Sequence, residues 1–179
     1  AGIGVPQISA IMEVKNALGK KKIKIISDGG IKFSGDLAKA LAAGADAIMM
    51  GSIFAGTDES PGKKFKAKGK IFKVYRGMGS IGAMSSGSAN RYFQKNFKDK
   101  SKFVPEGVEG RVEYKGNVSK IIYQLKGGLR SSMGYIGAKN LDQIPKNAKF
   151  IKITKAGFYE SMVHSVEMTQ KTINYKLWQ

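Results

Sequence analysis

The sequence of 179 residues predicts a parallel α/β fold. Two segments near the N-terminus repeat apolar residues every three or four positions, which is the spacing of an amphipathic helix. Each is followed by a short apolar run that ends in glycines, which is typical of a buried strand. Helix, strand, helix and strand at such short spacing favour parallel strands that are covered by helices.

The first helix should begin at Pro6, where a missing backbone N–H costs nothing, and should end at Gly19. The second helix should run over residues 34–43. The strands that follow these helices are predicted at 23–27, which is rich in β-branched residues, and at 47–50.

The alternation of helix and strand stops after residue 60, where a long segment rich in lysine and glycine begins. A segment of this length without a helix–strand rhythm is typical of a lid or a disordered insertion. A hairpin turn is expected at 67–70, a strong helix from Asn117, and a short apolar strand at 150–153. The apolar face of that helix would carry Val118, Ile121, Ile122, Leu125 and Leu129.

The formal net charge is +18, and much of the excess lies between Pro61 and Lys102. That stretch holds twelve Lys or Arg residues and one acid, Asp99. Such a stretch can be a solvated basic loop, a loop that works over anionic ligands, or a nucleic-acid surface. The aromatic residues nearby do not fall into a recognisable nucleic-acid module, so a nucleic-acid partner is not expected.

The composition excludes several kinds of protein. Cysteine is absent, so this chain has no disulfide and no thiolate metal site of its own. No apolar run reaches the ~18 residues that span a bilayer, and no basic-then-apolar leader precedes the first helix. We therefore expect no membrane partner and a cytoplasmic location.

Two strands with their helices cannot close a sheet, so the fold needs either partner strands from another chain or the rest of a longer protein. We interpret the chain as a C-terminal fragment of a larger (β/α)8 TIM barrel. In such barrels, phosphate is often bound by the loops after the last two strands. Backbone N–H groups at glycine turns and helix N-termini point at the anion there. Asp28-Gly29-Gly30 and Gly51-Ser52 supply two such loops, and Asp28 can accept two hydrogen bonds from a ribose diol. The alternative is a pair of tight turns in which Asp28 is only a cap.

A third loop, Tyr75-Arg76-Gly77-Met78-Gly79-Ser80, favours nucleotide binding. A tyrosine hydroxyl donates to phosphate, and glycines let the backbone approach a flat base. The Met78 side chain by itself is expected to pack rather than to recognise a ligand.

Many further short motifs accompany these loops in a fixed order along the chain. They are Gly4-Val5-Pro6-Gln7, Asp28-Gly29-Gly30-Ile31, Leu41-Ala42-Ala43-Gly44-Ala45, Gly51-Ser52, Gly56-Thr57-Asp58-Glu59-Ser60-Pro61-Gly62, Tyr75-Arg76-Gly77-Met78-Gly79-Ser80, Ala83-Met84, Arg91-Tyr92-Phe93, Val104-Pro105-Glu106-Gly107, Glu109-Gly110-Arg111-Val112 and Gly127-Gly128-Leu129-Arg130-Ser131. Together they resemble inosine monophosphate dehydrogenase from residue 1 to about 165. The Pro-Glu-Gly setting of Glu106 resembles the bacterial type.

This resemblance implies NAD-dependent oxidation of inosine 5′-monophosphate (IMP) to xanthosine 5′-monophosphate in guanine nucleotide synthesis. In the family a cysteine attacks C2 of the purine, hydride passes to NAD, and water hydrolyses the resulting thioimidate. The cysteine loop would lie just before Ala1, so this chain alone should be inactive. The resemblance assigns activation of the water to Arg91, helped by Tyr92, although sequence alone would make Arg91 a surface charge.

The resemblance also implies contacts with the substrate. Asp28 would hold the ribose, Glu106 would contact the N1 edge of the purine, and the amides of Met78 and Gly79 would face the base. The complete substrate set is Asp28, Gly29, Gly30, Gly51, Ser52, Tyr75, Gly77, Met78, Gly79 and Glu106, in which Gly30, Gly51, Ser52 and Tyr75 would hold the phosphate.

Cofactor and ion contacts are implied as well. Tyr114 resembles a residue that borders the adenosine of NAD across a subunit interface. The carbonyls of Glu160, Ser161 and Met162 match a segment that binds a potassium ion of a neighbouring subunit, although Met162 stands where related bacterial chains often have histidine. His164 is expected to be a surface or packing histidine.

The implied enzyme is a homotetramer whose barrel is completed by its N-terminal half. Residues 1–60 would form the last two β/α units of the barrel, 61–115 a mobile flap with a finger-like hairpin, and 116–179 the final barrel helix and C-terminal segment. The rival enzyme is guanosine monophosphate reductase, which shares the barrel and phosphate loops but is not expected to carry the Arg91-Tyr92 flap. A rival without enzymatic activity is a basic RNA-binding fragment.

Overall fold

The computed structural model describes residues 2–94, 100–163, 165, 166 and 169. The chain forms two compact units, each built from two stretches of sequence. The parallel unit comprises Val5–Met50 and Ser119–Gln179, and the antiparallel unit comprises Ala1–Gly4 and Gly51–Val118. The prediction for His164 lies outside the described residues.

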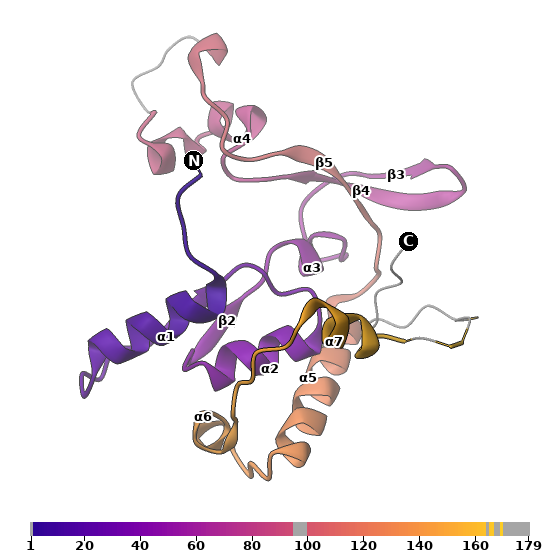
Figure 1. The fold of residues 1–179 in the computed structure, drawn as a ribbon. Helices are drawn as coiled ribbons and strands as arrows, with labels where there is room; N and C mark the ends of the chain where they lie inside the picture. Colours follow the sequence, from indigo (N-terminus) through magenta and orange to yellow (C-terminus); the bar gives the residue numbers. More distant parts are fainter. Residues whose placement is uncertain (1, 95–99, 164, 167–168, 170–179) are drawn as a thin grey trace. The chain divides into compact units, whose positions relative to one another are not determined.

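The parallel unit contains the order of helices and strands that the sequence predicts. Strand β1 pairs in parallel with β2, with Ile26 opposite Ala47 and Asp28 opposite Met49. The mixed α/β class is therefore confirmed. The elements of this unit are α1 (Gln7–Leu18), β1 (Ile26–Asp28), α2 (Ser34–Ala42), β2 (Ala47–Met49), α5 (Val118–Tyr135), the 3-10 helix η3 (Leu141–Gln143), α6 (Ile144–Asn147) and α7 (Lys155–Glu160) (Figure 1).

The helix ends follow the signals in the sequence. Pro6 is the N-cap of α1, and Gly19 follows its last residue with a φ of 52°, a conformation that glycine adopts without strain. Ahead of α2, the Asp36 carboxylate accepts hydrogen bonds from the backbone N–H groups of Lys32 and Phe33, both at 3.0 Å. An acid in the first turn also interacts well with the positive end of the helix dipole.

The first strand is shorter than predicted and lies further along the chain. The sequence predicts 23–27, whereas β1 begins at Ile26. β-Branched residues favour strands, but a strand also needs a partner for its backbone groups. The partner here, β2, is three residues long, and Ile23 and Ile26 remain 56% and 58% exposed.

The predicted strand at 150–153 is wrong, because this segment is irregular in the structure. Ile151 and Ile153 are 82% and 56% exposed. An apolar run forms a strand only beside another strand, and neither β1 nor β2 is paired with this one. The helix after Asn117 is confirmed as α5, although of its predicted apolar face Ile121 and Leu125 are buried while Ile122 is 49% exposed.

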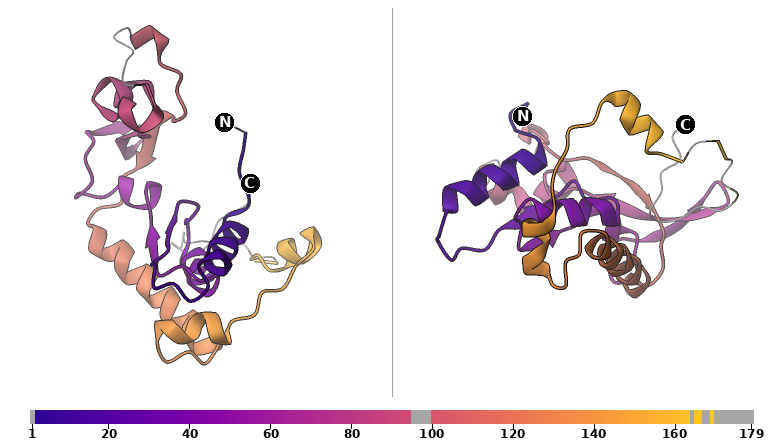
Figure 2. Two further views of the ribbon diagram at one scale, coloured as in Figure 1. Left: turned by 90° about the vertical axis from the view of Figure 1, so that its left-hand side faces the viewer. Right: turned by 60° about the horizontal axis from the view of Figure 1, so that its bottom comes forward.

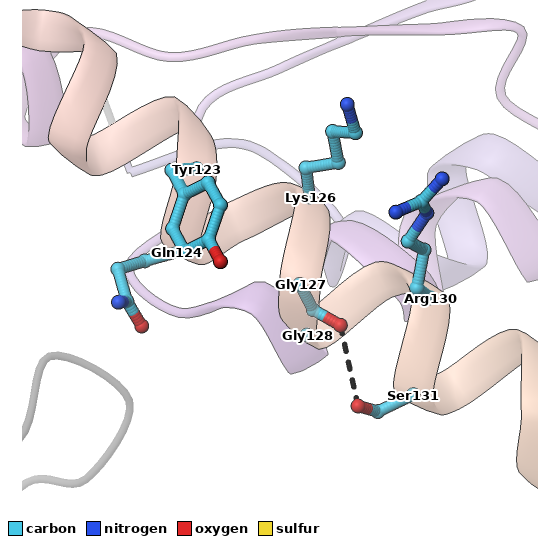
Figure 3. A pocket seen from close by; sticks show the side chains of 7 residues that line it. All are labelled: Tyr123, Gln124, Lys126, Gly127, Gly128, Arg130 and Ser131. Carbon is cyan, nitrogen blue, oxygen red and sulfur yellow. Dashed lines mark hydrogen bonds between the residues drawn. The ribbon is translucent and has the colours of Figure 1, made fainter.

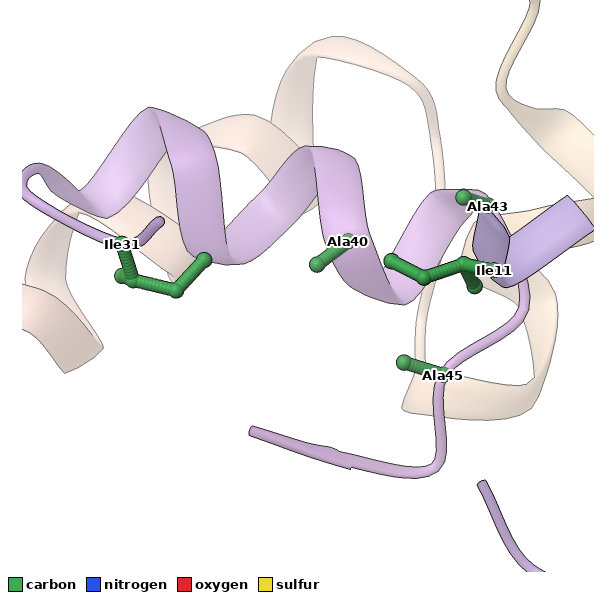
Figure 4. Close-up of a cluster of buried hydrophobic side chains, with 5 residues drawn as sticks. All are labelled: Ile11, Ile31, Ala40, Ala43 and Ala45. Atoms are coloured by element: carbon green, nitrogen blue, oxygen red, sulfur yellow. The ribbon is translucent and has the colours of Figure 1, made fainter. Parts of the chain in front are cut away.

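Small side chains let the helices of the parallel unit approach one another closely. Ile11 of α1 packs with Ile31 and with Ala40, Ala43 and Ala45 around α2 (Figure 4). Along the chain, α5 leads into the turn that carries α6 (Figure 2). A second cluster there consists of Leu41, Ala138 and Ile144. Burial of these apolar side chains is the main stabilising term of the unit.

The antiparallel unit is built around a three-stranded sheet in the order β3–β4–β5. The hairpin turn predicted at 67–70 is confirmed: Lys68 and Gly69 have φ values of 50° and 73°, as a two-residue type I′ turn requires. The lysine-rich stretch, for which rhythm alone suggested a lid or disorder, thus contains an ordered sheet. The elements are α3 (Ser52–Ala55), β3 (Lys64–Ala67), β4 (Lys70–Arg76), α4 (Ile81–Ser85), the 3-10 helices η1 (Ser88–Tyr92) and η2 (Lys100–Lys102), and β5 (Glu109–Glu113).

Throughout the described part of the chain, the helices are too short or too polar to cross a bilayer.

Two adjacent glycines in α5 give opposite predictions. A Cβ on Gly128 would strike the side chain of Ser34, whereas a Cβ on Gly127 would meet nothing within 4 Å. We expect Gly128→Ala to destabilise the chain by about 1–3 kcal/mol through overpacking. Gly127→Ala should stabilise it by about 0.5–1 kcal/mol, because alanine has the higher helix propensity. Urea unfolding of both variants beside the parent chain measures this; equal effects would contradict the close contact between α5 and α2.

Candidate functional site

The antiparallel unit contains an open cavity of about 1180 Å³. Its walls come from residues 60–63 after α3, from the end of β4 and from the α4–η1 segment. Tyr75, Met78 and Arg91, three residues that the sequence assigns to a site, are among the lining side chains. Pockets that enclose drug-sized ligands measure roughly 300–1,000 Å³, so this open cavity is large enough for a ligand of that size.

Met78 differs from its prediction. The sequence suggested that its side chain packs in the interior, but the side chain is 50% exposed and faces the cavity. The reason is local: Met78 lies in the turn between β4 and α4, outside the regular elements. Tyr75, three residues earlier on β4, is half-buried.

Close backbone contact joins the loop at 77–79 to the loop at 106–107. The backbone N–H groups of Glu106 and Gly107 both donate to the carbonyl of Gly79, each at 3.0 Å. A Cβ on Gly107 would stand 2.9 Å from the carbonyl carbon of Gly79, so this approach requires glycine. Gly77 continues the contact, because its N–H donates to the carbonyl of Val108 at 2.9 Å. Glu106 therefore lies directly beside the loop that the sequence assigns to the base.

Helix η1 brings Arg91 and Tyr92 to the same loop. The hydroxyl of Ser88, the first residue of η1, donates to the carbonyl of Met78 at 2.6 Å. A Cβ on Gly79 would stand 2.9 Å from Cζ of Tyr92, so the ring lies against the Gly79 backbone. Arg91 is exposed and lines the cavity. Of the expected catalytic pair, Tyr92 thus lies against the expected base-binding loop, and Arg91 lines the cavity that Met78 also lines.

Most of the residues that are expected to hold phosphate and ribose lie at strand ends. Gly51 is the N-cap of α3 and Ser52 its first residue, while Ala55 at the other end of α3 lines the cavity. Asp28 ends β1 in the parallel unit with its carboxylate exposed. Gly29 and Gly30 follow it with φ values of 89° and 78°, which only glycine adopts readily. Their ligand contacts stay predictions.

The end of β1 is fixed by a side chain from the neighbouring helix. Gln7, at the start of α1, donates through Nε2 to the hydroxyl oxygen of Ser27 at 3.1 Å and to the carbonyl of Asp28 at 3.2 Å. The N–H of Gly29 donates to the carbonyl of Met49 at 3.2 Å. These bonds leave the Asp28 carboxylate at a fixed strand end, where it can accept hydrogen bonds from a ligand.

Tyr114 lies in a charged cluster. Its hydroxyl donates to both carboxylate oxygens of Asp58 at 2.9 Å. The ammonium of Lys64 pairs with Asp58 and lies 4.2 Å from the centroid of the Tyr114 ring. Hydrogen bonds from Lys64 and from Tyr114 hold the pKa of the Asp58 carboxyl below its ordinary value, and Asp58 in turn raises the pKa of Lys64. The hydroxyl of Tyr114 and one face of its ring are therefore occupied.

Lys73 is a buried lysine that sequence reasoning missed. It is 2% exposed, and its ammonium donates to the carbonyls of Thr57, at 2.6 Å, and Ser60. Thr57 is itself 1% exposed and donates through Oγ1 to the carbonyl of Phe54 at 2.8 Å. The ammonium therefore joins β4 to the segment after α3, which are two walls of the cavity. The sequence gives little sign of this burial, because a buried lysine cannot be told from the many exposed lysines around it by composition alone.

Arg76 and Glu109 were missed as well. Both line the cavity, and they lie opposite each other on β4 and β5. Each lies in a motif that carries the family resemblance, but the sequence did not predict a function for either side chain. Only the register of the two strands, which the sequence does not reveal, brings them together.

The described residues hold no cluster of three or more His, Cys, Asp or Glu side chains that could bind a metal. Glu160 is the last residue of α7 and Ser161 is its C-cap, followed by Met162. Carbonyls of the last helical turn point out of that end, where the helix dipole also favours a cation. This segment therefore fits carbonyl ligation of an ion whose other ligands come from elsewhere.

A second hollow, of about 350 Å³, lies along α5 (Figure 3). It is lined by Tyr123, Gln124, Lys126, Gly127, Gly128, Arg130 and Ser131, all from this one helix. Within it, the hydroxyl of Ser131 donates to the carbonyl of Gly127 at 3.2 Å. Because its lining comes from one element, it is a surface hollow and a poorer candidate than the cavity beside Arg91.

Comparison with known proteins agrees with the motifs. A family model described as "IMP dehydrogenase / GMP reductase domain" matches residues 1–164. The chain is 55% identical over 177 residues to inosine-5'-monophosphate dehydrogenase of Chlorobaculum parvum, covering 98% of this chain and 36% of that protein. The enzyme of the same name from Aquifex aeolicus is 55% identical over 176 residues (98% and 35%), and that from Cryptosporidium parvum 52% over 175 residues (98% and 44%). The chain thus spans less than half the length of these relatives.

Lys73→Met tests the buried ammonium. The variant keeps most of the side-chain volume but leaves the carbonyls of Thr57 and Ser60 without this donor, which should cost about 1–3 kcal/mol. Lys66→Met is the matched control, because Lys66 lies on the neighbouring strand β3 with an exposed side chain, and it should change stability by less than about 0.5 kcal/mol. Urea unfolding measures both; a neutral Lys73→Met would show that the ammonium is not needed.

Because the pKa of Asp58 is lowered, we expect the folded chain to lose stability in acid. The Asp58 pKa in the folded state lies below the ordinary 3.8, so its contribution is complete above that pH and is lost as pH falls through the lowered pKa. Asp58→Asn should therefore be less stable than the parent at neutral pH, with the difference vanishing at the acid end. Urea unfolding of both proteins across this range measures the difference.

Tyr114→Phe refines the same test, because it removes the second donor and should bring the pKa of Asp58 closer to 3.8. NMR titration of the carboxyl carbon reports that pKa directly. A parent Asp58 that titrates at or above its ordinary value would refute the cluster.

Proposed function

The chain belongs to the IMP dehydrogenase / GMP reductase family, and from this premise we propose that it forms part of an NAD-dependent IMP dehydrogenase. The observation that carries the proposal is the meeting of Glu106 and Tyr92 at Gly79, in a loop whose Met78 lines the same cavity as Arg91. The complete protein would oxidise IMP to xanthosine 5′-monophosphate in guanine nucleotide synthesis.

A barrel is the architecture that best accounts for the exposed strands. Ile26 of β1 and Met49 of β2 are 58% and 49% exposed, and parallel sheets are normally covered on both faces. We infer that further strands complete a (β/α)8 barrel around β1 and β2. In this arrangement residues 1–60 are the last two β/α units, 61–115 the flap with its hairpin, and 116–179 the final helix and C-terminal segment.

Within this proposal, the chain holds the nucleotide by backbone and carboxylate groups. Asp28 holds the ribose, and Gly30, Gly51, Ser52 and Tyr75 hold the phosphate. The amides of Met78 and Gly79 face the base, and Glu106 contacts the N1 edge of the purine. Gly29 and Gly77 shape these loops. Support comes from the exposed Asp28 carboxylate at a fixed strand end and from the cavity that Tyr75 and Met78 line.

The chemistry divides between this chain and a cysteine outside it. That cysteine would add to C2 of IMP, and NAD would supply the acceptor for the hydride that leaves C2. A water must then replace the sulfur at C2, and it must lose a proton as it attacks. Arg91 and Tyr92 are the groups of this chain placed to orient and deprotonate it.

NAD and potassium would contact other parts of the chain. The half-buried ring of Tyr114 would border the adenosine of NAD, with the Asp58 bond fixing its orientation. The carbonyls of Glu160, Ser161 and Met162 would join the ligands of a potassium ion, because hard oxygen donors suit such ions. We further propose a homotetramer in the cytoplasm.

Guanosine monophosphate reductase is the alternative. The same family model covers both enzymes, but the relatives described above are named as dehydrogenases. The Arg91-Tyr92 pair beside the base loop also favours hydrolysis over reduction. The reductase is therefore the weaker candidate.

Assay of the complete polypeptide that contains this chain tests the proposal. With IMP and NAD it should form NADH and xanthosine 5′-monophosphate in equal amounts. Asp28→Ala should lower kcat/KM for IMP about 10- to 100-fold, the worth of one or two charge-assisted hydrogen bonds. Glu13→Ala, an exposed acid on α1, is the matched control and should leave kcat/KM unchanged. NADPH-dependent deamination of GMP, without NADH formation from IMP, would establish the reductase instead.

A further inference from the structure

Two oppositely charged side chains, those of Arg76 and Glu109, bind the backbone of Gly82 in α4 and together form a grip on this residue. Arg76 and Glu109 are direct partners on β4 and β5. Oε1 of Glu109 accepts a hydrogen bond from the backbone N–H of Gly82 at 2.7 Å, and the Arg76 guanidinium donates to the Gly82 carbonyl at 3.2 Å. The N–H and the C=O of the same residue are therefore held by side chains from the sheet.

Gly82 fits this grip closely. A Cβ there would stand 2.5 Å from Oε1 of Glu109 and 3.4 Å from Cδ of Arg76, so a larger residue would displace the carboxylate. Ser86 tightens the arrangement, because its hydroxyl donates to the Gly82 carbonyl at 2.8 Å and accepts from Arg76 at 3.2 Å. Hydrogen bonds to charged groups are stronger than those between neutral groups. The grip is thus a specific, charge-assisted contact.

The gripped helix leads directly to the residues assigned to catalysis. Two residues separate α4 from η1, which contains Arg91 and Tyr92. Arg76, Glu109 and Arg91 line the same cavity. The polar atoms of Arg76 and Glu109 bind Gly82 and Ser86, so they act on the cavity through α4.

We propose that Arg76 and Glu109 are positioning residues, which orient the α4–η1 segment and thereby set the place of Arg91 beside the cavity. The step that depends on this placement is the attack of water at C2, so this part of the inference rests on the proposed function. A pair that merely stabilised the sheet would affect the step that forms NADH and the hydrolysis step equally.

Hydrogen exchange tests the grip without reference to activity. In the complete protein, Glu109→Ala should speed exchange of the amides in residues 81–92 at least tenfold, because local opening becomes easier. Glu113→Ala is the matched control: Glu113 is also on β5 and pairs with Lys70 at 3.1 Å, and it should leave those amides unchanged. Equal exchange in the two variants would overturn the grip.

Rapid-mixing kinetics test whether Arg76 and Glu109 position Arg91 for the hydrolysis step. Glu109→Ala should lower steady-state turnover about 10- to 100-fold, the scale of a misplaced catalytic group, while the first burst of NADH keeps its rate within about twofold. Glu109→Gln, which keeps an oxygen acceptor but loses the charge, should lie between this variant and the parent. It also carries the test if Glu109→Ala does not fold.

The outcomes separate the two proposals. A parent protein that forms no NADH from IMP would refute the proposed function and leave the exchange result standing. A parent that is active, combined with a burst that slows as much as turnover in the Glu109 variants, would overturn the positioning role.

Discussion

The site depends on one close backbone approach, between the glycine loop 77–79 and the loop at 106–107. The Gly79 carbonyl accepts two N–H groups at 3.0 Å, and its missing side chain leaves room for the Tyr92 ring. A β-carbon at either position 79 or 107 would separate these loops. Residues far apart in sequence, Glu106 and Tyr92, therefore meet at Gly79 because no side chain stands between them.

Several lysines of the antiparallel unit have defined partners, which the net charge alone does not indicate. Lys64 pairs with Asp58, Lys70 pairs with Glu113, and the buried Lys73 ammonium binds backbone carbonyls. A buried ammonium must find partners, because desolvation without them is costly. Lys73 thus joins β4 to the segment after α3, whereas the ion pairs of Lys64 and Lys70 are exposed and contribute little. A purely solvated basic loop, one interpretation of the lysine-rich stretch, does not describe them.

Features that depend on local chemistry were predictable, and features that depend on a distant partner were not. The ends of α1 and the 67–70 turn follow from proline, glycine and the turn's demand for positive φ. The strand at 150–153 fails because an apolar run needs a neighbouring strand, and Lys73 escaped notice because its burial depends on the loop at 57–60. At the site, motifs identified Glu106 and Arg91, but the partnership of Arg76 with Glu109 needs the register of β4 and β5.

The way in which α4 is held suits the mobile flap that the proposed function requires. This five-residue helix buries Ala83 and Met84, so its apolar contribution is small. Charge-assisted bonds at Gly82 provide much of the remaining attachment, and such bonds, each worth about 1.5–3 kcal/mol, depend steeply on direction. Helix α2, by contrast, is anchored by two apolar clusters. A few directional bonds can release and re-form as a set, whereas a packed core cannot. Under the proposed function, the residues that activate water therefore belong to a segment attached by few bonds.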